Sequence, residues 1–378
     1  MNDEPSTTTP TSPKVSRVPV TLDDLTAHLL WPQLWKVPKL ALAPGRLGLS
    51  AALLVLVFGL DHLWQSAFGG PAPGPLTVLL IDMAAAWRAA LSHLIAGDAS
   101  RAGYALLDLF LRRPAAFAMG EMGQAGLARG LTAALILAPI ALTAASVLAG
   151  AVSRSVAREF GQNLVEPWTR SLGFSLGRWR SMVGAVAGPL VLAWALCGLL
   201  WVAGKLLLSL PGLDVVGGLI FPVFLLGGLV VALVLAAYAL GQGLLLPAVA
   251  CDGVDAFDAV QRAYAYVFGK PLRLLLYQAL ALAISVVAMV LLQTVVMLLL
   301  ALLGHITGVP IEALGDEART NPGWTARASA WLIGFWVALV QLGVAAYAVS
   351  LYCAAQTIVY LLVRRLNDGL DTREVAEG

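Results

Sequence analysis

Charged residues are scarce in this sequence, because Asp, Glu, Lys and Arg make up only 12% of its 378 residues whereas 59% are hydrophobic. Soluble domains carry roughly a quarter charged residues, so this composition excludes a soluble globular protein. Five stretches contain no charged residue, and each exceeds the ~20 residues that a helix needs to cross a bilayer. These stretches are 130–153, 181–204, 215–251, 274–311 and 328–363.

The motifs of common enzyme classes are also absent. The sequence has no His-Glu-x-x-His, no Gly-rich loop followed by Lys-Ser/Thr, and no Gly-x-Ser-x-Gly. Its four histidines are scattered, and its three cysteines (Cys197, Cys251 and Cys353) show no paired spacing, which favours small apolar fillers over a disulfide or metal site. We therefore predict a protein that is not an enzyme, with no catalytic residues, cofactor or metal, and no nucleic-acid partner.

A sixth crossing is predicted near the start of the chain. Leu47–Leu60 is apolar over only ~21 Å at 1.5 Å per residue and continues to Phe68, so Asp61 should lie near an interface rather than in a proton or substrate site. The predicted fold class is an all-α polytopic membrane helix bundle of about six transmembrane helices. It follows a partly disordered tail (1–45), precedes a short tail (367–378), and has crossings at about 46–68, 130–153, 181–204, 222–248, 274–303 and 330–363.

Basic residues gather in alternate gaps between these crossings. The segments 1–46, 151–180, 248–273 and 364–378 hold 16 Lys and Arg residues, and the opposite set holds 8. Because Lys and Arg mark cytoplasmic loops, both termini are predicted on the cytoplasmic side. The alternative is that 47–68 only dips into the membrane, which would leave five crossings and place the N-terminus outside.

The segment 67–129 lies on the opposite side in this topology. Residues 76–96 repeat apolar side chains at spacings of three and four, which predicts an amphipathic helix. We expect this helix to lie on the membrane surface or to pack on the bundle, with Asp82 and Arg88 on its wet face.

Two basic segments on the cytoplasmic side are predicted to form amphipathic elbow helices, at 163–180 and 255–268. In the second, Asp255 suits an N-cap, Asp258 is spaced to pair with Arg262, and helix capping accounts for the Asp252, Asp255 and Asp258 series better than a divalent cation does. Its predicted apolar stripe is Phe257, Val260, Tyr264, Val267 and Phe268. The basic residues expected at the lipid headgroups are Arg170, Arg178, Arg180, Lys270 and Arg273.

Polar residues inside the crossings are few. They form either a solute pathway or an interhelix hydrogen-bond network, and the network is the favoured interpretation. The set is Tyr238, Gln242, Gln293, Gln341, Tyr352 and Gln356.

A resemblance enters through Leu246-Pro247, Gly253, Ala256–Val260 and Lys270–Arg273. This pattern resembles an element of Yip-type proteins and of the membrane domains associated with glycerophosphodiester phosphodiesterases. The start at Trp31–Leu42 and the end at Tyr360–Arg365 resemble uncharacterised multi-pass proteins of planctomycete-like bacteria. The resemblance implies a helical bundle in the bacterial inner membrane and assigns no activity or functional residue.

Two functions remain in view. The first is a non-catalytic scaffold, membrane-organising protein or accessory subunit. The second is a transporter or channel for a lipid or small solute. The expected partners are the lipid bilayer, other membrane proteins or anionic lipids, and further copies of the chain.

Overall fold

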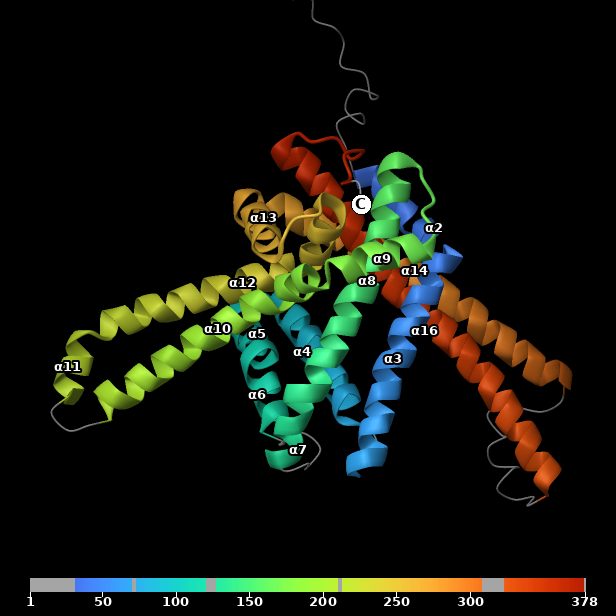
Figure 1. Cartoon of the computed structure of the whole chain (residues 1–378), viewed down its shortest axis with the longest axis horizontal. Coiled ribbons are helices and arrows are strands. Elements are labelled where there is room, and N and C mark those ends of the chain that lie inside the picture. Colours follow the sequence, from blue (N-terminus) through green and yellow to red (C-terminus); the bar gives the residue numbers. More distant parts are fainter. Residues whose placement is uncertain (1–30, 70–72, 120–126, 210–212, 308–322, 377–378) are drawn as a thin grey trace, which may run out of the picture.

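The computed structural model describes residues 31–69, 73–119, 127–209, 213–307 and 323–376. Every regular element in these ranges is a helix (Figure 1). The predicted disorder of the N-terminal tail falls largely on residues outside these ranges. The chain is an all-α, multi-pass membrane protein, as its composition predicts.

Seven of the described helices are long and apolar enough to cross a membrane. Six contain the predicted crossings, and the seventh is α4 (Pro75–Ile95). The first, α3, runs unbroken for 25 residues, which does not support the alternative in which it only dips into the membrane. The six are α3 (Pro44–Phe68), α8 (Ala138–Gln162) with the turns before it, α10 (Trp179–Leu208), α12 (Phe221–Asp252), α14 (Pro271–Thr307) and α16 (Trp324–Asp368).

The segment between α3 and α8 is a set of packed helices. α4 contacts α3, α5 and α6, so it packs on the bundle, which is one of its two predicted placements. Its buried residues are Leu76, Ala86 and Ala90. The C-terminal part of the predicted stripe, including Ile95, is exposed. The elements that follow α4 are α5 (Ala99–Leu107), η2 (Asp108–Arg112), α6 (Arg113–Ala118), α7 (Leu127–Thr132) and η4 (Ala133–Leu137).

Two of these elements, η2 and η4, are π-helical turns, and each ends two residues before a proline. Proline has no N–H and crowds the carbonyl four residues earlier, and a π turn is one way in which a membrane helix accommodates it. Pro114 thereby leaves the Phe110 carbonyl without its usual α-helical donor, and the Trp194 indole of α10 donates to that carbonyl at 3.1 Å. The π turn at η2 is therefore fixed by packing against α10.

Two long hairpins diverge from one end of the molecule (Figure 1). One consists of α10, α11 (Leu213–Leu219) and α12, and the other of α14 and α16. α12 and α14 are apolar on all sides, which is typical of helices surrounded by lipid. The far halves of both hairpins expose large apolar side chains, among them Leu199, Leu226, Leu298 and Trp336.

The end from which the hairpins diverge gathers the N-terminal helices η1 (Trp31–Lys36) and α2 (Val37–Ala41), the two elbows and the end of α16 (Figure 1). The elbows are α9 (Trp168–Gly177), within its predicted segment, and α13 (Ala256–Gly269), which ends one residue beyond its predicted segment. Asp255 caps α13 by accepting from the Asp258 N–H at 2.9 Å, as predicted, and α14 begins at Pro271, three residues before the predicted crossing.

The predicted apolar stripe of α13 is buried only in part, because Val267 is buried and Val260 and Tyr264 are half-buried. Phe257 and Phe268 are 76% and 58% exposed. The buried residues are Ala259, Ala263, Tyr266 and Val267. Ala259 and Ala263 suit the buried face because α13 packs closely on α10 and α12, where Gly241 leaves room for Val267 and Ala263.

Candidate functional sites

Three arginines are buried where α3, α8, α12 and α16 come together, each with 1–2% of its surface exposed. They are Arg46, Arg154 and Arg364. We call these arginines, their acidic partners Glu159, Glu166 and Asp252, and the C-terminal residues 369–376 the charged hub. Buried charges must be paired and hydrogen-bonded, so the partners of each arginine define what the hub does.

Arg46 joins the N-terminal helices to α8. Its Nε donates to the Ser155 hydroxyl at 3.0 Å and its guanidinium also pairs with Glu159. A further bond reaches the Leu40 carbonyl of α2. One side chain therefore holds α2, α3 and α8 together.

Arg154 joins α8 to α9 and α12. It donates to the Ala250 carbonyl at 3.0 Å, lies 3.9 Å from Glu166, and stacks 4.1 Å from the centre of the Phe174 ring. The ring face attracts the cation in a site where water is excluded. This contact positions the α9 elbow.

Arg364 pairs with Asp252, and Asp252 also accepts from Tyr360 and, at 2.6 Å, from Arg262. The predicted Asp258–Arg262 pair is therefore wrong. Asp252 is the last residue of α12, and Arg262 of α13 reaches back to it across the corner at Gly253. The buried carboxylate competes better than the exposed Asp258 because its ion pair is less screened by water.

The C-terminal residues close the hub. Arg364 donates to the Asp371 carbonyl at 3.0 Å, and the Ala376 N–H donates to the Cys251 carbonyl at 2.7 Å. Tyr266 of α13 donates to Asp368, and burial, together with that carboxylate, raises the pKa of Tyr266. The hub is thus an interlocked polar layer, and its acids serve to hold helices.

The five predicted elbow residues divide into two groups. Arg178 donates to the Gly253 carbonyl and Lys270 donates to the Leu366 carbonyl at 2.8 Å, so both join helices. The other three are exposed: Arg170, beside Glu166, Arg180, beside Trp179, and Arg273. Only these three remain candidates for lipid headgroups.

The predicted polar residues of the crossings do not form one group. Gln356 and Gln278 exchange two hydrogen bonds of 2.9 and 3.0 Å between α16 and α14, and Gly243 of α12 lies directly against Gln356. Tyr238 is buried and packs edge-on against Phe110, with ring centres 5.4 Å apart. Tyr352 is 53% exposed. Gln242, Gln293 and Gln341 are half-buried and make no hydrogen bond to another side chain within the described ranges.

Asp61 has a structural use that the sequence does not reveal. It is buried and accepts from the Leu76 and Thr77 N–H groups at 2.9 and 3.2 Å and from the Thr77 hydroxyl at 2.6 Å. These are N–H groups of the first turn of α4, so Asp61 caps that helix from α3. Asp61 is thus a buried helix cap, and its placement near an interface stays a prediction.

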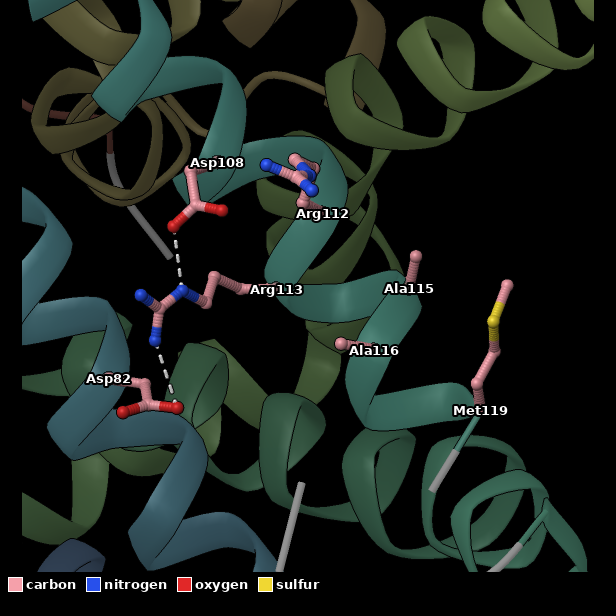
Figure 2. Close-up of a pocket in the computed structure, with 7 residues that line it drawn as sticks. All are labelled: Asp82, Asp108, Arg112, Arg113, Ala115, Ala116 and Met119. Carbon is pink, nitrogen blue, oxygen red and sulfur yellow. Dashed lines mark hydrogen bonds and ion pairs between the residues drawn. The ribbon is translucent and has the colours of Figure 1, made fainter. Parts of the chain in front are cut away.

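A second ionic cluster lies between α4 and the η2–α6 segment (Figure 2). Arg113 contacts Asp82 at 3.0 Å and Asp108 at 2.7 Å, so Asp82 is not on a free wet face. The cluster borders a cavity of about 520 Å³ that is also lined by Arg112, Ala115, Ala116 and Met119. Neither Asp108 nor the two arginines were candidates from sequence, because 67–129 was expected to lie outside the membrane.

The π turn creates this cluster. The Arg113 N–H donates to the Asp108 carbonyl five residues earlier. In an α-helix, residues five apart point about 140° apart at 3.6 residues per turn. The wider turn brings Asp108 and Arg113 onto one side, where both meet Asp82 of α4 (Figure 2). Such turns are frequent at functional sites.

Contacts with α10 and α12 set the level of the cluster. Phe110, within the same π turn, accepts a hydrogen bond from Trp194 and packs on Tyr238. Trp194 lies half-way along α10 and Tyr238 half-way along α12. Asp108, Arg112 and Arg113 therefore lie level with the middle of two membrane-spanning helices, where ionisable residues are rare and mark functional sites.

Comparison of the chain with protein-family models, with curated proteins and with solved structures finds no match in any of the three. The resemblance to Yip-type, phosphodiesterase-associated and planctomycete-like membrane proteins stays a prediction. The class of protein that the fold defines is a multi-pass helical membrane protein.

Proposed function

We propose that the chain is a non-catalytic integral membrane protein that organises the bilayer or scaffolds other membrane components. We place it in the bacterial inner membrane with both termini cytoplasmic, so that the charged hub faces the cytoplasm. The basic-residue count supports this orientation, because the 16 Lys and Arg residues of the predicted cytoplasmic segments include those of the hub.

One observation carries this proposal: two apolar hairpins diverge from a single interlocked hub (Figure 1). Their far halves contact lipid with side chains such as Leu226 of α12 and Leu298 of α14, which are 63% and 65% exposed. A small hub that spreads two long hairpins covers a wide area of membrane. That geometry suits a protein that acts on the bilayer and on neighbours in it.

The elbow helices fit the same role. An exposed tryptophan, Trp179, lies beside the exposed Arg180, and Phe268 is exposed near the end of α13. Trp and basic side chains are typical of the membrane–water interface. We therefore assign α9 and α13 as amphipathic interfacial helices whose exposed residues contact anionic headgroups.

The polar residues of the spans support the scaffold over a transport path. Gln356 is paired with Gln278, and Tyr238 is packed on Phe110. Side chains that bind one another across helices are an interhelix network rather than a solute lining.

The test is reconstitution into vesicles of defined lipid composition at increasing protein content. Wild-type protein should change the vesicle diameter, as measured by electron cryomicroscopy, without releasing small trapped solutes. Leu298→Arg places a charge on the far half of α14, which costs about 2.5–3.5 kcal/mol in the bilayer centre, and should abolish the change in diameter.

Leu272→Arg is the matched control, because Leu272 is also exposed on α14 but lies beside Arg273 at the hub end. This variant should behave as wild type. Vesicles that keep the protein-free diameter at every protein content, or that leak solute only when wild-type protein is present, would contradict the proposal.

A further inference from the structure

We propose that the cavity between α4 and the η2–α6 segment binds a monoanion that carries a carboxylate or phosphate next to an apolar group, and that Arg112 is the residue that binds its charge. This site is separate from the hub and from the diverging hairpins, so the inference does not depend on the proposed function.

The two arginines that line the cavity differ in their ion pairs within the described residues, because Arg113 has two and Arg112 has none. Asp82, Asp108, Arg112 and Arg113 sum to zero, yet Arg113 binds both carboxylates, at 3.0 and 2.7 Å. Arg112 is exposed toward the cavity and forms no ion pair within the described part of the chain. Figure 2 shows the two arginines pointing in different directions, with only Arg113 between the acids.

The level of Arg112 makes an unpaired charge costly. Its neighbour Phe110 packs against the middle of α10 and α12, through Trp194 and Tyr238. A guanidinium at that level of a bilayer requires a counter-charge or water. Since Arg113 contacts both nearby carboxylates, we infer that a molecule entering the cavity supplies the counter-charge of Arg112.

The walls of the cavity specify the chemistry of that molecule. A guanidinium presents paired donors that fit the two oxygens of a carboxylate or phosphate. Asp82 and Asp108 disfavour a second negative charge on the ligand, which selects a monoanion. Ala115, Ala116 and Met119 supply an apolar wall, and about 520 Å³ accommodates a small organic molecule.

Such an anion has two sources. It is the head of a fatty acid or other single-charged lipid that enters from the bilayer, or a water-soluble organic anion. Arg112 binds the negative charge in the same way in both cases, and the two molecules differ in the length of the apolar group.

The experiment uses the full chain in nanodiscs of phosphatidylcholine, with radiolabelled decanoate as the probe in a scintillation proximity assay. Wild-type protein should bind decanoate saturably. Arg112→Gln should weaken binding roughly 10- to 100-fold, the loss expected for one charge-assisted hydrogen-bonded contact. Arg112→Lys keeps the charge and should retain part of the affinity.

Arg88→Gln is the matched control, because Arg88 is an exposed arginine of α4 whose one hydrogen bond within the described residues, at 3.4 Å, goes to the Ala84 carbonyl of its own helix. It should bind decanoate as wild type does. Competition then identifies the source: displacement by acetate in the same concentration range as unlabelled decanoate indicates a soluble anion, and displacement by decanoate alone indicates a lipid-derived one. Both results support the site.

The inference is overturned if wild-type protein shows no saturable binding of decanoate or acetate. It is also overturned if Arg112→Gln, folded as judged by an unchanged unfolding transition, binds with wild-type affinity. Because Arg112 has no ion pair within the described ranges, its replacement should leave folding intact, so that loss of binding reports on the site.

Discussion

Arg364 binds the Asp252 carboxylate across 112 residues of sequence, with only 2% and 6% of the two side chains exposed. Removing one member of a buried pair leaves an uncompensated charge, which costs about 3–5 kcal/mol. We therefore expect Asp252→Ala to lower the free energy of unfolding by that amount, as measured by titration with SDS in mixed micelles.

Asp258→Ala provides the comparison. Asp258 lies six residues further along, is exposed, and forms no salt bridge within the described residues. Its loss should change the unfolding free energy by less than about 0.5 kcal/mol, as for other surface substitutions. Equal effects of the two substitutions would show that the hub does not hold α12 to α16.

The hub also predicts a dependence on alkaline pH. The pKa of Tyr266 is raised by burial and by Asp368, so its hydroxyl stays protonated in the folded protein after an unfolded tyrosine, with a pKa of about 10, begins to ionise. Its contribution to stability is therefore complete below pH 10 and is lost as the pH rises toward the folded pKa.

Tyr266→Phe should remove this part of the alkaline decline and cost about 1 kcal/mol at neutral pH, the value of one hydrogen bond. The measurement is the unfolding free energy as a function of pH. Tyr104→Phe, at a side chain that is 74% exposed, serves as the control and should follow the wild-type curve. A Tyr266→Phe curve that also follows wild type would exclude the hydrogen bond to Asp368.

Composition, the five charge-free runs and the shorter apolar segment Leu47–Leu60 were sufficient to predict the fold class and six of the seven candidate spans, because helices in lipid must be long and apolar. The elbows and the Asp255 cap were also predictable, since capping depends on local sequence. The sequence did not predict contacts between residues far apart in the chain. Arg262 pairs with Asp252 instead of Asp258, and Asp61 caps a helix that begins 14 residues later.

The candidate site was hidden for a related reason. Asp82 was expected on the wet face of an amphipathic helix, and Arg113 was counted only among the basic residues of 67–129, because the charge content of 99–118 hides helices packed against the spans. A signal was present in Pro114, which follows a run of apolar and charged residues and fixes a π turn at Asp108–Arg112. Only the partners of that turn, Trp194 and Tyr238, reveal its level in the membrane.

The reciprocal amide pair between Gln278 and Gln356 should behave as a structural contact. Interhelix hydrogen bonds in membranes contribute about 0.6 kcal/mol on average and rarely more than about 1.7. In a double-mutant cycle with Gln278→Leu and Gln356→Leu, we expect a coupling free energy in this range, measured by SDS unfolding. Gln293→Leu, on the same helix as Gln278, should show no coupling to Gln356→Leu. A coupling free energy of zero between Gln278 and Gln356 would show that their hydrogen bonds do not stabilise the packing of α14 on α16.

The topology of 67–129 can be tested by labelling of single cysteines with a membrane-impermeant maleimide, after replacement of the three native cysteines by alanine. Gly173→Cys on α9 and Asp258→Cys on α13 lie at the hub and should react from one side of the membrane, whereas Pro73→Cys, between α3 and α4, should react from the other. Gly97→Cys, in the turn after α4, should not react from the side of Pro73, because α4 runs back along α3 for 21 residues.

Labelling of Gly97→Cys and Pro73→Cys from the same side at similar rates would mean that 67–129 is an external segment. The ionic cluster of Arg113 would then lie in water, and the argument for a bound counter-anion at Arg112 would lose its physical basis.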